Sequence, residues 1–291
     1  MSIDLLHEKI RKLKCPVIVD LCMKEELLPP HLLEQEGSYS KAYFRFCGEI
    51  LEAVAPVVPG VRFSFDEFAL LGAEGLENLS KLLKRAGELG LYRLLDGPQI
   101  LSPWCADRAA SLLENDAYPC DGMIISPYIG SDSIKPFVPA CAKGEKDLYV
   151  VVRSANKSAS ELQDLLTGKR LVHGAAAELV NRFADPILTK CGYSRICAVA
   201  SAGSPDSLRN LRGQYKHIFL LVDGLDYPSG NVKNCSYAFD RLGYGAAISA
   251  GPLITAAWKA DEGASGISYT DAALQEIERI RKNLLRYITI L

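Results

Sequence analysis

Eight short apolar runs, most of them followed by a segment of helical period, predict a closed (β/α)8 barrel, the TIM barrel, for this 291-residue sequence. The runs are continuous in apolar residues, as in buried parallel strands whose outer face is covered by helices. An open doubly wound sheet would more often carry a glycine-rich G-x-G-x-x-G after its first strand, and none follows residues 16–21. We expect one barrel domain over residues 1–291, because no linker, repeat or low-complexity stretch divides the chain.

The expected strands are residues 16–21 (PVIVDL), 61–65 (VRFSF), 92–96 (YRLLD), 122–126 (GMIIS), 147–152 (DLYVVV), 196–200 (ICAVA), 217–222 (HIFLLV) and 246–250 (AAISA). Between them, apolar residues recur at helical spacing, which predicts helices packed on the outside of the barrel. These helices are expected at residues 41–55, 75–89, 105–115, 158–168, 175–190 and 204–215. Ser2 is a candidate cap for an opening helix, and Thr270 for a closing helix over residues 270–291.

Charge and hydropathy exclude two classes of partner. The formal net charge is -2 and the pI is near 6.1, so no positive field attracts nucleic acid or an anionic membrane. The most apolar long stretch, residues 246–258, contains a glycine and a proline and is shorter than the roughly 18 residues of a membrane span. We therefore expect neither nucleic acid nor membrane as a partner.

Two further features favour a cytoplasmic location. Residues 1–14 carry charges at Asp4, Glu8, Lys9 and Arg11, so they lack the apolar core of a secretory signal. The nine cysteines have no paired spacing and no C-x-x-C, which is typical of reduced thiols rather than disulfides or a zinc site.

In a barrel, the chemistry takes place at the carboxyl ends of the strands, which form the mouth. The residues that close each expected strand are Asp20, Cys22, Asp66, Glu67, Asp96, Ser126, Tyr128, Arg153, Ser154, Asn156, Ser201, Asp223, Asp226 and Ser249. The mouth is therefore rich in acids. An aspartate in such a loop more often caps the next helix than performs catalysis, so each acid has both interpretations.

Five stretches resemble orotidine 5'-monophosphate decarboxylases in their longer bacterial form. They are residues 16–34, 59–79, 121–138 (with SPYIGSDSIKPF), 148–165 (with RSANKSASELQ) and 196–258. The resemblance runs from end to end of the chain, with these phrases in the family's order. It implies a TIM barrel, a role in pyrimidine biosynthesis and a cofactor-independent carboxy-lyase reaction.

The family reaction leaves a carbanion, which an alternating array of lysines and aspartates stabilises and protonates. The resemblance places a lysine at the end of the second strand and an Asp-x-Lys-x-x-Asp at the end of the third. Here the first position is Arg62, and the motif reads DGPQIL, so Asp96 stays while Pro98 and Leu101 replace the other two members. Arginine, with a pKa above about 12, is a poor proton donor, and proline has no side-chain proton.

The positions that hold the nucleotide in the family also differ here. The family's Leu-Asp-Pro, Thr-Ser-Asn, Pro-Gly-x-Gly-Ala-Gln-Gly-Gly and Ser-Arg correspond to residues 21–23 (LCM), 154–156 (SAN), 223–230 (DGLDYPSG) and 250–251 (AG). Ala155 has no group to bind a pyrimidine, and Gly251 stands where the family's arginine grips the phosphate. Asp223 and Asp226 add negative charge at the expected phosphate position.

The resemblance therefore leaves Asp96 and Arg62 as catalytic candidates and predicts no cofactor and no metal. The candidates for the substrate pocket are Asp20, Cys22, Asp66, Ser126, Arg153, Ser154, Asn156, Asp223, Gly224, Gly230 and Gly251.

Two alternative hypotheses about the function follow from these residues. The first is a non-catalytic paralogue whose decarboxylase activity is weak or absent, and which acts as a binding or regulatory subunit for a small molecule or nucleotide, with an active decarboxylase as a possible partner. The second is an enzyme, either a decarboxylase with a rearranged site or one that uses the acidic mouth for another reaction, with a divalent or organic cation as ligand.

The resemblance also predicts a homodimer, because the family pairs barrels through the loop after the third strand. In this chain that loop carries Leu101, Pro103 and Trp104 and is more apolar than the charged version it replaces.

Overall fold

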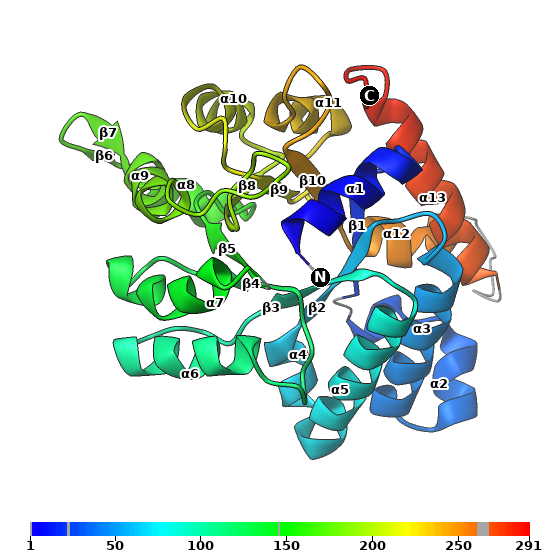
Figure 1. The fold of residues 1–291 in the computed structure, drawn as a ribbon. Coiled ribbons are helices and arrows are strands. Elements are labelled where there is room, and N and C mark those ends of the chain that lie inside the picture. The colour runs from blue at the N-terminus through cyan, green and yellow to red at the C-terminus, as the bar shows by residue number, and fades with distance from the viewer. Residues whose placement is uncertain (1, 22–23, 145, 261–267) are drawn as a thin grey trace.

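Eight parallel strands close into a barrel in the computed structural model, which describes residues 2–21, 24–144, 146–260 and 268–291 (Figure 1). The strands are β1 (Val17–Asp20), β2 (Gly60–Ser64), β3 (Tyr92–Asp96), β4 (Gly122–Ile125), β5 (Asp147–Val151), β8 (Ile196–Ser201), β9 (Leu220–Asp223) and β10 (Ala246–Ala250). Around the barrel the order is β1, β10, β9, β8, β5, β4, β3, β2, so neighbours in the chain are neighbours in space. This confirms the predicted TIM barrel.

The helices lie outside the strands (Figure 1). They are α1 (Ile3–Leu13), α2 (Pro30–Glu36), α3 (Tyr39–Val54), α4 (Phe65–Leu70), α5 (Gly72–Glu88), α6 (Pro103–Leu113), α7 (Val138–Ala142), α8 (Ser160–Gln163), α9 (Val172–Ala184), α10 (Pro205–Gln214), α11 (Val232–Cys235), α12 (Pro252–Thr255) and α13 (Tyr269–Leu284). Short 3-10 turns occupy Glu25–Leu27, Gly130–Ser133, Lys135–Phe137, Lys157–Ala159, Ser236–Ala238 and Ala257–Ala260.

The prediction of a helix over residues 158–168 is wrong in its second half. α8 ends at Gln163, and the chain then forms a hairpin of β6 (Leu166–Thr167) and β7 (Arg170–Leu171), which projects away from the barrel (Figure 1). Gly168 turns the hairpin with a φ of 64°, a conformation that glycine adopts readily and that a helix cannot contain.

Three helix ends also differ from the sequence predictions. α9 ends at Ala184 rather than continuing to residue 190, because Pro186 has no N–H with which to continue the helical hydrogen bonds. α13 begins at Tyr269, so Thr270 lies inside the helix and is not its cap, and it ends at Leu284 rather than at residue 291. Ser2 does precede α1, but its side chain makes no capping hydrogen bond.

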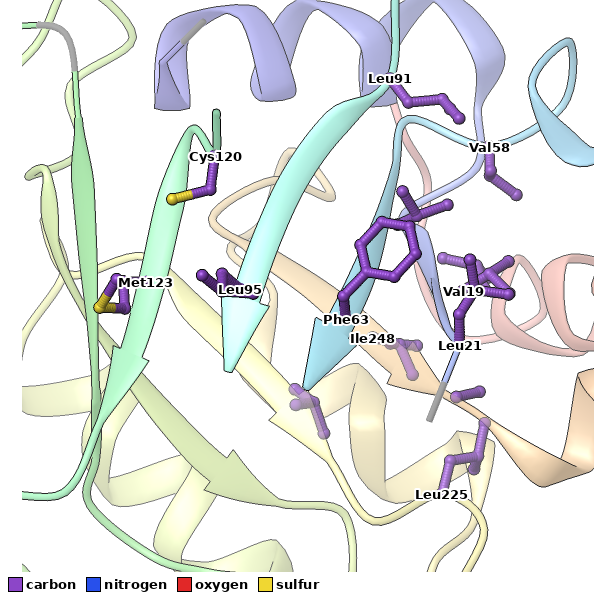
Figure 2. Close-up of a cluster of buried hydrophobic side chains, with 14 of the residues drawn as sticks. Val19, Leu21, Val58, Phe63, Leu91, Leu95, Cys120, Met123, Leu225 and Ile248 are labelled. Atoms are coloured by element: carbon purple, nitrogen blue, oxygen red, sulfur yellow. The ribbon is translucent and has the colours of Figure 1, made fainter. Parts of the chain in front are cut away.

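Alternate strand residues face opposite sides of the barrel wall, as the period of two requires. The outward residues Val19, Phe63, Leu95 and Met123, on four neighbouring strands, belong to the main apolar core under the helices (Figure 2). The inward residues belong to a second cluster inside the barrel, whose members include Ile18, Leu94, Ile124, Val199, Leu221 and Ala247.

α1 covers the end of the barrel opposite the mouth. Its buried residues Ile3, Leu6 and Ile10 join the interior cluster, so the helix closes the amino-terminal ends of the strands. The open end is therefore the carboxyl end, where the sequence places its candidate residues.

Candidate functional site

Arg62 lies at the centre of the mouth. It is on β2, directly beside Asp20 of β1 in the register of the two strands, and it is only 8% exposed. Its neighbour Phe63 faces the outer core, so the alternation of the strand turns Arg62 into the barrel. A charged side chain this buried needs counter-charges close by.

Three aspartates supply those counter-charges, each from a different strand end. Arg62 Nη2 donates to Asp96 Oδ2 at 2.6 Å. Nη1 lies 3.3 Å from Asp20 Oδ2 and 3.3 Å from Asp223 Oδ2. Nη1 also donates to Ser249 Oγ at 3.4 Å, which brings in β10. The structure thus brings Arg62 to Ser249, which lies 187 positions away in the chain.

The charges of this Arg62 cluster do not balance. Among the described residues, one guanidinium faces three carboxylates, so these four groups carry an excess of negative charge when all are ionised. Its cation remains protonated because the pKa of arginine is above about 12. Arg62 is therefore an electrostatic anchor for the mouth, and its side chain is a poor source of a proton.

The segment after β3 contains the remaining positions of the family motif. Pro98 and Leu101 line a cavity beside Asp96, and Leu101 is 76% exposed. Neither side chain carries an ionisable group, so Asp96 is the one acid between residues 94 and 102 and its carboxylate is bound to Arg62.

Asp226 holds the backbone amides at the start of α12. Its carboxylate accepts from Gly251 N at 3.0 and 3.2 Å and from Leu253 N at 2.7 Å. Burial raises the pKa of Asp226, the amide hydrogen bonds oppose that shift, and the nearby Asp223 adds to it. In TIM barrels that bind phosphate, the phosphate site is often formed by the loops after the seventh and eighth strands and a short helix. Here a carboxylate of the chain itself is bound at that place.

The loops after β5 and β9 touch above the barrel. Gly224 has a φ of 84°, and a Cβ built on it would lie 2.2 Å from Cβ of Ala155. Gly230 packs as closely on the carbonyl of Gly224. These two glycines therefore allow close packing of loops, and neither is among the residues that line the cavity beside Asp96.

Arg153 is fixed by the loop that follows it. Its guanidinium makes a bidentate pair with Asp164, at 3.0 and 2.9 Å, and donates to the carbonyl of Ser154 at 2.8 Å. Gln163 bonds both the backbone N and the Oγ of Ser154, and Ser154 Oγ donates to Asn156 at 2.7 Å. Arg153, Ser154 and Asn156 line a separate cavity of about 380 Å³, which lies next to residues 227–229.

Asp66 and Ser126 lie on the other side of the mouth. Both line the cavity of about 570 Å³ that also contains Asp96, Pro98 and Leu101. Burial raises the pKa of Asp66, and the charge of Asp96 raises it further. The structure thus divides the predicted pocket residues between two cavities and the Arg62 cluster, rather than gathering them in one pocket.

Two candidates for the substrate pocket remain, Gly251 and Cys22. Gly251 lies against Asp20, whose Cβ would be 3.4 Å from a Cβ built on the glycine. Cys22 lies outside the described residues.

Within the described ranges, no three acidic, histidine or cysteine side chains are placed to hold a metal ion. The carboxylates of Asp20, Asp96 and Asp223 surround a guanidinium instead. Over the same part of the chain, no helix has both the length and the apolar character to cross a membrane.

Sequence reasoning missed the partners that fix the fifth-strand loop, Gln163 and Asp164. Both follow the RSAN stretch closely, and an acid eleven residues after a buried arginine was the available signal. It was hidden because residues 158–168 were expected to form a single helix.

Comparison with known proteins supports the resemblance found in the sequence. No family model matches the chain. The curated orotidine 5'-phosphate decarboxylase of Rhodopirellula baltica is 32% identical over 235 residues, which cover 79% of this chain and 78% of that protein. The chain belongs to the orotidine 5'-phosphate decarboxylase family. The family member from Clostridium kluyveri is 26% identical and aligned over 98% of both chains.

Solved structures of the family agree with the fold. The orotidine monophosphate decarboxylase of Leishmania donovani has a TM-score of 0.71 and 24% identity, and the match covers 97% of this chain and 100% of that one. The decarboxylase of Plasmodium berghei has a TM-score of 0.74 at 13% identity, with coverage of 97% and 98%. The barrel of this chain is thus the family's barrel over nearly its whole length.

Proposed function

We propose that this chain is a non-catalytic member of the orotidine 5'-phosphate decarboxylase family, which acts as a binding or regulatory subunit in the cytoplasm. The observation that carries the proposal is the Arg62 cluster. At the position where the resemblance places a lysine that stabilises and protonates the carbanion, the chain has a guanidinium that contacts Asp20, Asp96 and Asp223. A group that is both neutralised and unable to release a proton at neutral pH does not suit that role.

Two further observations support the proposal. Pro98 and Leu101 stand at the other positions of the array, and neither carries a charge. Asp226 is bound to the amides of Gly251 and Leu253, where a phosphorylated ligand would have to compete with an attached carboxylate. Asp223 lies nearby and adds to the repulsion of a phosphate dianion.

The test is decarboxylation of orotidine 5'-monophosphate by the purified protein at high concentration, with Asp96→Ala measured beside it. We expect no turnover by either protein and no thermal shift with the nucleotide product. Equal turnover by both would identify a contaminating host enzyme, which leaves the proposal intact. Turnover that Asp96→Ala abolishes would overturn it, since the site would then work with Asp96.

As for partners, the proposal includes a homodimer and, where an active decarboxylase is present, pairing with that enzyme. Its support is the exposed apolar surface after β3, where Leu101 is 76% and Trp104 66% exposed. The support for a cytoplasmic location is that the eight described cysteines are free thiols.

A second candidate function is a different reaction that uses the acidic mouth. Asp66 favours it, because its carboxyl group lines a cavity and burial raises its pKa, as is common for a general acid or base. Substrate screening of the wild type against Asp66→Asn would test it, and a reaction lost in the variant would support an enzyme.

A further inference from the structure

The cavity of about 570 Å³ between the ends of β2, β3 and β4 has two unlike walls. One wall carries the carboxylates of Asp66 and Asp96. The other is apolar and consists of Ile124, Ile125, Ile129 and Val151. Its volume is in the range of sites that bury a small organic molecule. At its rim lies Tyr128, whose side chain is 80% exposed.

No cation among the described residues forms an ion pair with the Asp66 carboxylate. Its carboxylate makes no hydrogen bond or ion pair there, and no lysine, arginine or histidine lines the cavity. Arg62, in the same mouth, is bound to Asp96 and lies near Asp20 and Asp223. Asp66 thus lies beside a second carboxylate on one wall of the cavity, and a positive charge placed against that wall would be attracted by both.

We infer that this cavity binds a small organic cation with a flat apolar body. The positive group pairs with Asp66, and the body lies against Ile124 and Ile129. An amidinium or guanidinium fits best, because its planar pair of N–H groups matches a carboxylate. The inference rests on the proposed function, because a working decarboxylase of this family would use the mouth for an anion.

Two other ligand classes are less well matched to these residues. A phosphorylated ligand meets the carboxylates of Asp66 and Asp96 in the cavity. A divalent metal would require three suitable side chains, and the described part of the chain offers no such group. The apolar wall adds nothing to metal binding but does contribute to binding an organic body.

Three probes with the same ring separate these classes. Benzamidine is a cation, benzamide is its neutral analogue and benzoate is an anion. Binding to the full-length protein is measured by calorimetry and by protein-observed NMR, with Mg²⁺ as a fourth probe. We expect benzamidine to bind at least about tenfold more tightly than benzamide, and benzoate and Mg²⁺ to show no binding.

The matched variants are Asp66→Asn and Asp116→Asn. Asp116 is exposed in the turn before β4, at the opposite end of the barrel, and its replacement changes the net charge equally. Asp66→Asn should weaken benzamidine about tenfold and leave benzamide unchanged, whereas Asp116→Asn should change neither. Equal binding of all three ring probes, no binding of benzamidine, or an unchanged affinity in Asp66→Asn would each overturn the inference.

The decarboxylation assay keeps the two proposals apart. Absent turnover together with absent benzamidine binding refutes the cation site alone. Turnover that depends on Asp96 refutes the proposed function, whatever the probes do.

Discussion

Arg62 Nη2 lies 2.6 Å from Asp96 Oδ2, and this contact joins the second strand of the barrel to the third at the level of the mouth. The same guanidinium lies 3.3 Å from Asp20 and from Asp223. Three acids of the mouth thus contact one guanidinium, and its removal should lower the stability of the fold.

Arg62→Met should lower the free energy of unfolding by about 2 kcal/mol at neutral pH, because three partly buried carboxylates lose their counter-charge. Urea unfolding at neutral pH measures the loss. Arg45→Met is the control, since the Arg45 side chain is 39% exposed and its solvent-exposed pairs with Glu36 and Glu49 should contribute little. Equal losses in both variants would show that Arg62 has no special role.

Asp226→Ala should free the amides of Gly251 and Leu253 for an external anion. We expect phosphate in excess to raise the melting temperature of this variant and leave that of the wild type unchanged, relative to chloride at the same ionic strength. The stability of the variant without phosphate should fall by about 1–2 kcal/mol, because two amides lose their partner. If phosphate stabilises both proteins alike, the Asp226 carboxylate is not what excludes it.

Asp147 should make stability depend on pH. It is fully buried inside the barrel, where Tyr92 OH donates to it at 2.8 Å and Arg195 lies at 3.3 Å. Burial raises its pKa to about 7 from an ordinary value of 3.8. The folded state therefore holds a proton that the unfolded chain releases, and this contribution to stability is complete below pH 3.8 and lost as the pH rises through 7.

Asp147→Asn should remove that dependence. Relative to the variant, the wild type should lose up to about 1.4 kcal/mol of stability per pH unit between pH 5 and 7. Chemical unfolding across this range measures the difference, with exposed Asp132→Asn as control. A constant difference between wild type and Asp147→Asn would mean that Asp147 is ionised throughout.

Trp104→Glu should shift a dimer to monomer if the first turn of α6, after β3, forms the interface. Trp104 is 66% exposed and stacks with Arg108, whose guanidinium carbon lies 5.0 Å from the ring centre. Sedimentation velocity measures the change. Leu188→Glu alters another exposed apolar residue, 57% exposed, before β8 at the other end of the barrel, and should leave the dimer intact. A dimer that survives Trp104→Glu would place the interface elsewhere.

The strands could be predicted from the sequence because burial on both faces makes each an unbroken apolar run. The runs 92–96 and 246–250 match β3 and β10 residue for residue. The helix boundaries were harder to predict, since they depend on local turns such as that at Gly168, and the spacing of apolar residues does not indicate such turns. The hairpin of β6 and β7 is the clearest example.

The mouth was predictable in part, because a parallel barrel brings all its carboxyl strand ends to one face. That argument predicted the neighbourhood of Asp20, Asp96 and Asp223, but not that one side chain would bind all three. The contact of Asp226 with the start of α12 could not be predicted from the sequence, because it joins two loops whose paths are set by packing. The close approach of Gly224 to Ala155 is of the same kind.

If the chain is non-catalytic, as proposed, the position of Asp226 determines how decarboxylation could be introduced into this barrel by design. Replacing Pro98 by lysine and Leu101 by aspartate would restore two groups of the array, yet the amides of Gly251 and Leu253 would still hold an internal carboxylate. A redesigned enzyme would then have its proton donor but no free amides to bind the phosphate of the nucleotide. Such a redesign must therefore begin at residue 226, and the lysine and aspartate become useful only after that change.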